Sequence, residues 1–173
     1  MSVGGALDTN VLVRLIVHDD ATQALAVSRL LEQHVRRSES LWVAVTVMLE
    51  LEWVLRSRYK FTKTEVIRAF SSLLSTIELI FESEDAMEQA LASYEEGGAD
   101  FGGYLHLSLA QKGSALAFWT FDAKAARAVG AKLLKWRGWG LASDASAVPV
   151  IVDNKIPKRY HLRTLRITHR ESV

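Results

Sequence analysis

Four carboxylates lie on or beside apolar stretches of this chain, and they constrain its fold more than any other feature. They are Asp8, Glu50, Asp100 and Asp122. A buried carboxylate without a partner is costly, and no run of lysines or arginines stands beside any of the four. If folding gathers them, like charges about 4 Å apart repel by roughly 4 kcal/mol per pair inside a protein. A divalent cation such as Mg²⁺ or Mn²⁺ relieves that repulsion, so we predict a metal-dependent chemistry on phosphate groups.

Short apolar segments alternate with amphipathic ones along the chain. The apolar segments have the length of buried strands and cover residues 3–8, 41–45, 77–81, 115–120 and 148–152. The segments with helical spacing cover residues 21–36, 61–74, 83–95, 101–112 and 124–129, and another helix carries Glu50. We expect Thr46, Thr62 and Ser83 to begin helices as caps. Strands separated by helices require crossover connections, which predicts an α/β fold: a three-layer α/β/α sandwich with a central parallel sheet.

Two of the four carboxylates follow predicted strands directly. Asp8 ends the first apolar segment and Asp122 comes just after residues 115–120. Because ligands of parallel sheets bind at the carboxyl ends of the strands, this placement predicts a site at one edge of the sheet.

Composition limits the class of protein. The chain of 173 residues has no cysteine, which excludes thiolate zinc sites, a catalytic cysteine and disulfide bonds. It has no apolar stretch long enough to cross a membrane and no signal-peptide pattern at its start, so we expect a cytoplasmic protein without a membrane segment. Eight basic and three acidic residues lie from Lys135 onward, whereas the body before it is acidic. A basic end is compatible with contact to nucleic acid, and equally with a tail of no specific function.

Each candidate also has a purely structural interpretation. Asp8 could form an Asx turn, and Asp100 or Asp122 could cap a helix. Glu50 and Glu52 lie about 200° apart on a helix, so only one of them can face a given site, and we favour Glu50. Tryptophans could stack on bases, but we expect most of the five to be core residues and only Trp136 and Trp139 to be exposed.

The motifs around these residues resemble the PIN-domain family, in particular the VapC-like toxins of bacterial toxin–antitoxin pairs. The opening segment Leu7–Arg14, the stretch Met48–Leu55 and Thr120–Asp122 match the family's acidic motifs in order and spacing. The resemblance implies a Mg²⁺- or Mn²⁺-dependent endoribonuclease that forms a homodimer and is inhibited by a small antitoxin protein. It also implies that Asp8, Glu50, Asp100 and Asp122 are catalytic and metal-binding, and that Asn10 supports Asp8. Residues 1–134 would then form a PIN-like nuclease domain, with residues 135–173 as a basic C-terminal extension.

The third motif departs from the family pattern. Where the family commonly has Ala-Asp-Phe-Ala-Asp-Ala-Leu, this chain has a glycine, Gly103, in place of the second aspartate. Asp100 stands three residues earlier, on about the same face of a helix. The departure supports an alternative, in which a catalytically weakened PIN domain binds an antitoxin or RNA without cleaving. An aspartyl-phosphate enzyme of the haloacid-dehalogenase type is disfavoured, because Asn10 stands where its second aspartate is required.

Overall fold

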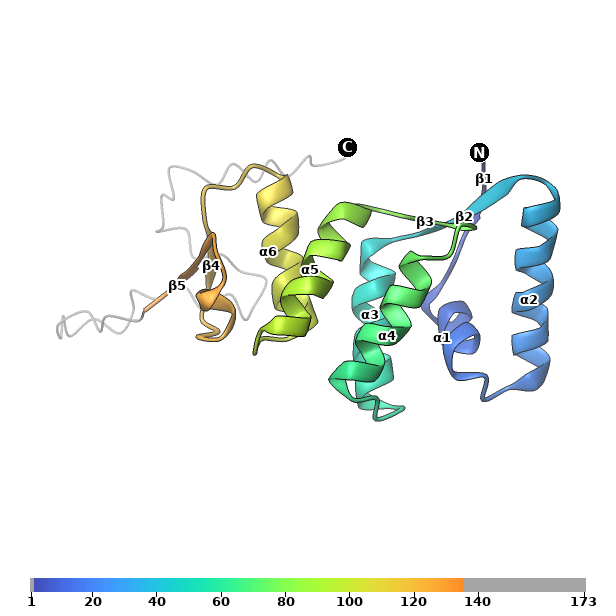
Figure 1. Ribbon diagram of the computed structural model, residues 1–173, viewed down its shortest axis with the longest axis horizontal. Coiled ribbons are helices and arrows are strands. Elements are labelled where there is room, and N and C mark those ends of the chain that lie inside the picture. Colours follow the sequence, from blue (N-terminus) through green and yellow to red (C-terminus); the bar gives the residue numbers. More distant parts are fainter. Residues whose placement is uncertain (1, 136–173) are drawn as a thin grey trace, which may run out of the picture. The chain divides into compact units, whose positions relative to one another are not determined.

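Three parallel strands form the main sheet of this protein. The computed structural model describes residues 2–135, and within them β1 (Ser2–Ala6), β2 (Glu39–Val43) and β3 (Leu79–Phe81) pair in the order β1-β2-β3 (Figure 1). Both pairs of neighbouring strands are parallel. The prediction of an α/β fold with a parallel sheet is therefore confirmed.

Helices make the crossover connections that parallel strands need. Between β1 and β2 lie α1 (Thr9–Val17) and α2 (Ala21–Arg36), and between β2 and β3 lie α3 (Val45–Ser57) and α4 (Lys63–Leu74). Two further helices, α5 (Glu84–Glu96) and α6 (Phe101–Lys112), follow β3 and pack against each other.

A second, smaller sheet differs from the expectation of one central sheet. Strand β4 (Phe118–Thr120) pairs in parallel with β5 (Ala131–Leu133), across the short 3₁₀ helix η1 (Ala125–Arg127). An α-helix was expected where η1 lies, and β5 was not predicted. In Figure 1, α5 and α6 stand between this pair of strands and the three-stranded sheet. The strand that precedes Asp122 is thus not a neighbour of β1 in the same sheet.

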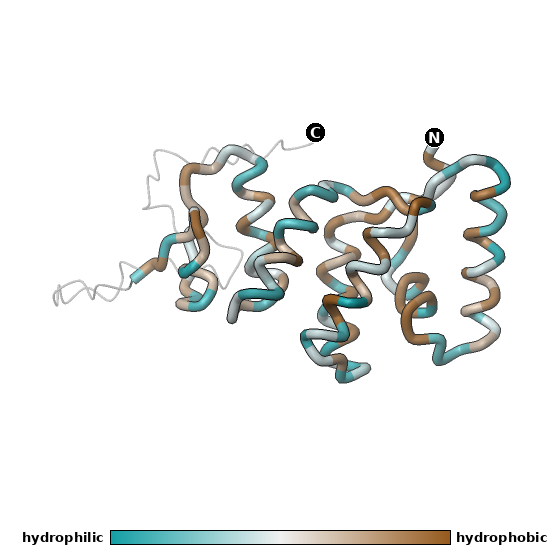
Figure 2. The backbone as a smooth tube through the Cα atoms, in the orientation of Figure 1, coloured by the Kyte–Doolittle hydropathy of each residue, from teal (hydrophilic) through white to brown (hydrophobic). Residues whose placement is uncertain are grey.

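The core is formed by buried residues of the main sheet and of the helices α1, α3, α4, α5 and α6. Phe101 is fully buried and packs edge-to-face on Phe70, with ring centroids 5.0 Å apart, and on Tyr94 at 6.0 Å. Such aromatic contacts stabilise beyond the area they bury. Figure 2 shows that the hydrophobic residues concentrate along the sheet and α1, while α2 alternates between hydrophobic and hydrophilic residues. Because Phe101 begins α6, this packing holds the start of that helix against α4 and α5.

Helix ends follow the sequence in part. Thr62 caps α4, as predicted, and it forms a complete capping box with Glu65 that was not predicted. Thr46 is not a cap, because α3 already begins at Val45 after Ala44. Ser83 precedes α5 in a left-handed conformation, and its side chain makes no cap hydrogen bond.

Exposed tryptophans correct a second expectation. Trp53 on α3 and Trp119 on β4 were expected in the core, yet their side chains are 66% and 60% exposed. The predicted strand at residues 148–152, the exposure of Trp136 and Trp139, and the basic extension beyond Lys135 lie outside the described residues.

Candidate functional site

The carboxyl end of β1 presents Asp8 to solvent. Asp8 is the N-cap of α1, where its Oδ1 accepts a hydrogen bond from the backbone N–H of Thr9 at 2.8 Å. The side-chain amide of Asn10 donates to Asp8 Oδ2 at 3.2 Å. Asp8 therefore has a structural role as the N-cap of α1. It leaves the carboxylate exposed and oriented, so a ligand role remains open to it.

Thr9 connects this turn to α3. Its side chain is buried, and its hydroxyl donates a hydrogen bond of 2.5 Å to Oε2 of Glu50. Asp8 and Glu50, which are far apart in the sequence, thus flank one threonine. Neither carboxylate forms an ion pair within residues 2–135, so a cation could approach both.

The other two predicted carboxylates lie in a different place. Asp100 and Asp122 line a cavity of about 520 Å³, together with Glu52 rather than Glu50. The cavity also has basic side chains, from Arg56, Lys63 and Lys124. Acidic and basic groups around one open cavity can hold a ligand that carries phosphate groups and a counterion.

Asp100 and Asp122 both have structural roles. Asp100 caps α6, where its Oδ1 accepts from the backbone N–H of Gly103 at 2.7 Å. Asp122 accepts from the N–H of Lys124 at 2.7 Å and so forms the turn that leads into η1. Each carboxylate keeps one oxygen outside these hydrogen bonds and is exposed.

Glu52 is the functional candidate that sequence reasoning set aside. Its side chain is only 16% exposed, Tyr94 donates a hydrogen bond to it at 3.4 Å, and Arg56 lies 4.0 Å away. Burial raises the pKa of the Glu52 carboxyl; Arg56 opposes this rise, and the negative charge of Asp100 adds to it. Raised pKa values of partly buried carboxyls are typical of functional sites. Glu50 and Glu52 face opposite sides of α3, as their spacing requires. Glu50 lies on the side of Asp8, and Glu52 lines the cavity with Asp100 and Asp122.

The four predicted ligands are not gathered into one metal site. Within residues 2–135, no group of three or more His, Cys, Asp or Glu side chains could hold a metal ion. Asp8 and Glu50 lie beside Thr9, whereas Asp100 and Asp122 line the cavity with Glu52. The carboxylates of a single chain therefore do not fit the expected four-ligand site.

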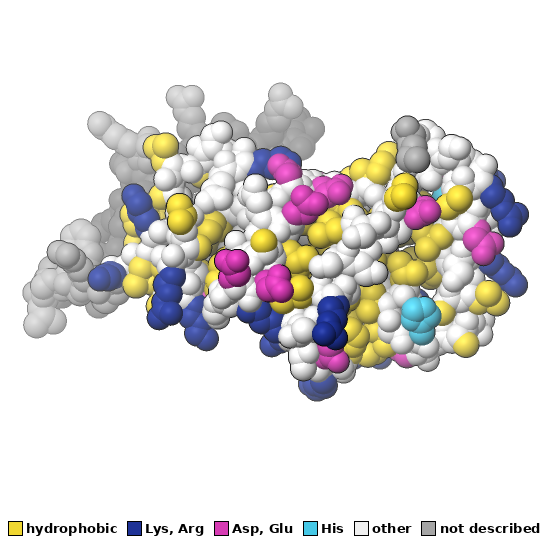
Figure 3. All heavy atoms as spheres, in the orientation of Figure 1, with side chains coloured by type: hydrophobic (Ala, Val, Ile, Leu, Met, Phe, Trp, Pro, Cys, Tyr) yellow, Lys and Arg dark blue, Asp and Glu magenta, His cyan; other side chains and the backbone are white. Residues whose placement is uncertain are grey.

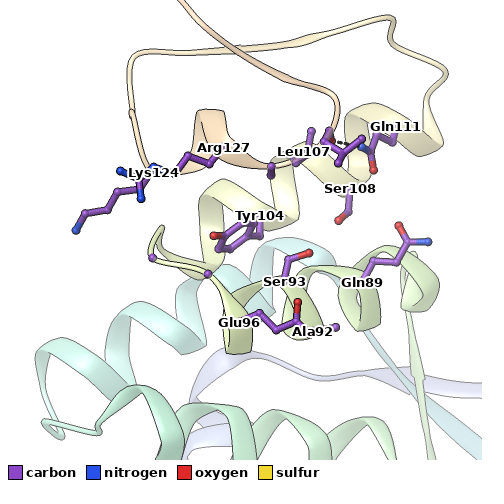
Figure 4. Close-up of a pocket in the computed structure, with 14 residues that line it drawn as sticks. Gln89, Ala92, Ser93, Glu96, Tyr104, Leu107, Ser108, Gln111, Lys124 and Arg127 are labelled. Atoms are coloured by element: carbon purple, nitrogen blue, oxygen red, sulfur yellow. Dashed lines mark hydrogen bonds between the residues drawn. The ribbon is translucent and has the colours of Figure 1, made fainter.

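A larger cleft of about 730 Å³ opens beside this cavity (Figure 4). Ser93 and Glu96 of α5 and Ser108 of α6 line it, and Lys124 and Arg127 of the η1 segment stand at its side. Its two cations could accept the phosphates of a nucleic-acid strand that continues from the cavity.

Comparison with known proteins identifies the family of this fold. A family model described as a PIN domain matches residues 6–131, which covers most of the chain. A search of curated proteins found no match. None of the helices within residues 2–135 combines the length and the apolar character that crossing a bilayer requires.

Proposed function

This chain belongs to the PIN-domain family, and on that basis we propose that it is a Mg²⁺- or Mn²⁺-dependent endoribonuclease of the VapC-like toxin type. PIN domains are generally metal-dependent nucleases, which makes nuclease chemistry the starting point. RNA as the substrate and toxicity as the role are the finer parts of the proposal.

The arrangement of Asp8, Thr9 and Glu50 is the observation that carries this proposal. Two exposed carboxylates from separate elements are oriented by a buried hydroxyl and by the amide of Asn10. Carboxylate oxygens are the ligands that Mg²⁺ and Mn²⁺ prefer. A carboxylate held by a hydrogen bond loses less entropy when it binds, so orientation by Thr9 and Asn10 favours ligand binding at this place.

Basic residues supply the contacts for an RNA backbone. Lys63 donates to the carbonyl of Gly97 at 2.8 Å, which positions its ammonium group at the rim of the smaller cavity. Lys124 lines both that cavity and the larger cleft, and Arg127 lines the cleft. Neutralisation of phosphates by Lys and Arg dominates affinity for nucleic acids and is weakened by salt.

Two protein partners belong to the same proposal. A toxin of this type acts as a homodimer and is held inactive by a small cognate antitoxin. Both are proposed from the family resemblance, and each has a direct test. Size measurement of the purified chain tests the dimer, and growth arrest on expression that is relieved by the neighbouring reading frame tests the antitoxin.

Cleavage of RNA by the purified full chain tests the central proposal. We expect cleavage that requires Mg²⁺ or Mn²⁺, stops with EDTA and is lost in Asp8→Ala. Asp85→Asn is the matched control, because Asp85 is an exposed carboxylate on α5 whose partner is Lys112. Cleavage that persists in EDTA, or that Asp8→Ala leaves unchanged, would contradict the proposal.

A second candidate function is binding without cleavage. Gly103 provides no carboxylate where the family commonly has one, and no site of three or more ligands forms within the described residues. A protein of this kind would bind RNA or an antitoxin and leave the RNA intact. Gel-shift binding of RNA with no cleavage at millimolar Mg²⁺ or Mn²⁺ would select this function over the first.

A further inference from the structure

The cleft between α5, α6 and the η1 segment contains polar side chains that the fold does not use. Gln89, Ser93 and Glu96 follow one another at spacings of four and three residues on α5, so they lie on one face of that helix. All three line the cleft, and within residues 2–135 their side chains form no hydrogen bond or ion pair. These groups are therefore free to bind a ligand.

Ser108 stands on the opposite wall of the cleft, on α6. It is only 5% exposed, yet its hydroxyl has no hydrogen-bond partner within residues 2–135. Because no fully enclosed side-chain oxygen in that part of the chain lacks a partner, the small exposed area of Ser108 includes its hydroxyl. In Figure 4 this hydroxyl is directed into the cleft, toward Ser93 and Gln89. Since buried polar groups normally have partners, this hydroxyl favours a ligand in the cleft.

Contacts within the chain keep the cleft formed without a ligand. Ala125 of η1 is buried, and the side-chain amide of Gln111 on α6 donates to the carbonyl of Val129 at 2.8 Å, which fixes the η1 segment against α6. Val129 and Leu107 add apolar surface to the lining, and Val129 is 90% exposed. A volume of about 730 Å³ with apolar walls and a few polar groups is typical of ligand sites.

The two sides of the cleft carry opposite charges. Glu96 lies on the α5 side, and Lys124 and Arg127 lie on the η1 side without an ion-pair partner in residues 2–135. Figure 3 shows basic side chains over the segment that contains η1 and acidic side chains on the neighbouring surface over α5. A flat ligand that fits between these sides must present hydrogen-bond donors to the carboxylate and acceptors to the guanidinium.

Guanine meets this requirement better than the other RNA bases. Its N1–H and N2–H donors lie side by side, and its O6 and N7 acceptors lie on the adjoining edge. Adenine and cytosine offer only an amino group to a carboxylate, and uracil offers a single N–H. The cleft is also continuous with the smaller cavity, because Gly97, Gly98 and Lys124 line both. A base in the cleft and a phosphate in the cavity can therefore belong to one RNA strand.

We propose that this cleft binds the guanine base of an RNA nucleotide. Glu96 accepts hydrogen bonds from N1–H and N2–H, Arg127 donates to O6 and N7, and the Ser108 hydroxyl adds a hydrogen bond at the edge of the base. Lys124, at the passage between the two cavities, contacts the phosphate. The inference rests on the proposed function, because the guanosine is then a neighbour of the phosphate that is cleaved.

Binding of RNA strands that differ at one base tests the inference without reference to cleavage. The full chain is titrated in EDTA into labelled oligouridine strands with one central guanosine, inosine, adenosine or cytidine, and fluorescence anisotropy gives the affinity. We expect guanosine to be preferred about tenfold over adenosine and cytidine, the discrimination typical of one bidentate base contact. Inosine, which lacks the N2 amino group, should bind with intermediate affinity.

Glu96→Gln should remove the preference for guanosine. Glu95→Gln is the matched control, because Glu95 is the exposed neighbour of Glu96 on α5 and does not line the cleft. Ser108→Ala should weaken binding of the guanosine strand about threefold or more and leave the thermal unfolding temperature unchanged or higher, because the hydroxyl has no partner in the described chain and alanine favours a helix. A lower unfolding temperature with unchanged affinity would assign the hydroxyl a structural role and contradict its part in the site.

Equal affinity for the four strands, or a Glu96→Gln variant that keeps the preference, would overturn the inference. Equal affinity for the strands together with binding of free GMP would overturn it as well, because the cleft would then serve a free nucleotide and not RNA. RNA cleavage without any preference for guanosine in binding would refute the inference and leave the proposed function intact. A preference for guanosine in a protein that cleaves no RNA would uphold the inference and refute the nuclease activity alone.

Discussion

Removal of the Thr9 hydroxyl should measure how strongly α1 and α3 are joined at the end of β1. Thr9→Val keeps the shape of the side chain and deletes the donor to Glu50. A hydrogen bond to a charged group contributes about 1.5–3 kcal/mol to stability. Because Glu50 is exposed and can regain water, the lower end applies. We expect a loss of about 1.5 kcal/mol in the free energy of unfolding, measured by urea denaturation.

A double-mutant cycle separates the hydrogen bond from other effects of the substitution. Glu50→Ala alone leaves the buried Thr9 hydroxyl unsatisfied, whereas Thr9→Val with Glu50→Ala removes both partners and should cost less than the sum of the single changes by about 1 kcal/mol. Thr64→Val, at an exposed threonine on α4, is the control and should stay within about 0.5 kcal/mol of wild type. A coupling energy near zero would refute the role given to Thr9.

Three further predictions concern the other acids. Asp100→Ala should lower the free energy of unfolding by about 1 kcal/mol through loss of the α6 cap, while Asp100→Asn, which can still accept the hydrogen bond, should lose little in the same denaturation assay. The raised pKa of Glu52 means that the folded state holds its proton more tightly than the unfolded state, so this carboxyl costs stability as pH rises above 4.5. Glu52→Gln should therefore gain stability relative to wild type between pH 4.5 and 7, and an unchanged difference across that range, followed by thermal melts, would contradict the burial argument. Gly103→Asp should raise metal-dependent RNA cleavage, because it supplies the acid that the family commonly has at this position. The new Cβ would lie 3.0 Å from Asp100 Oδ1, so the exposed Asp100 side chain must shift. Cleavage at the wild-type rate would argue against the alignment of Gly103 with the family's second aspartate.

The sequence predicted the main elements of the fold because local patterns determine them. The bounds of α2 and α6 coincide with the predicted ranges, and the capping box at Thr62 was readable from Thr62 and Glu65 alone. Strand pairing depends on residues far apart in the sequence, and no pattern in residues 115–120 indicates which other strand β4 pairs with. The division into two sheets was therefore outside what periodicity could predict.

The local structure around the candidate residues could be predicted from the sequence, whereas their grouping in space could not. The turn at Asp8 and the cap at Asp100 follow from the chemistry of short acidic side chains. Glu52 was missed because helical spacing shows only that it faces away from Glu50. The burial that raises the pKa of its carboxyl comes from tertiary packing, which spacing does not show. Its neighbour Arg56, one turn along α3, was the available signal that this face of the helix contains a charged group.

Binding of Mn²⁺ to the full-length protein, measured by isothermal titration, tests most directly whether the acids at the end of β1 hold a divalent cation. We predict binding at millimolar or lower concentration that is lost in Asp8→Asn and retained in Asp85→Asn. Equal binding by all three proteins, or none by the wild type, would contradict the metal-dependent account of this site.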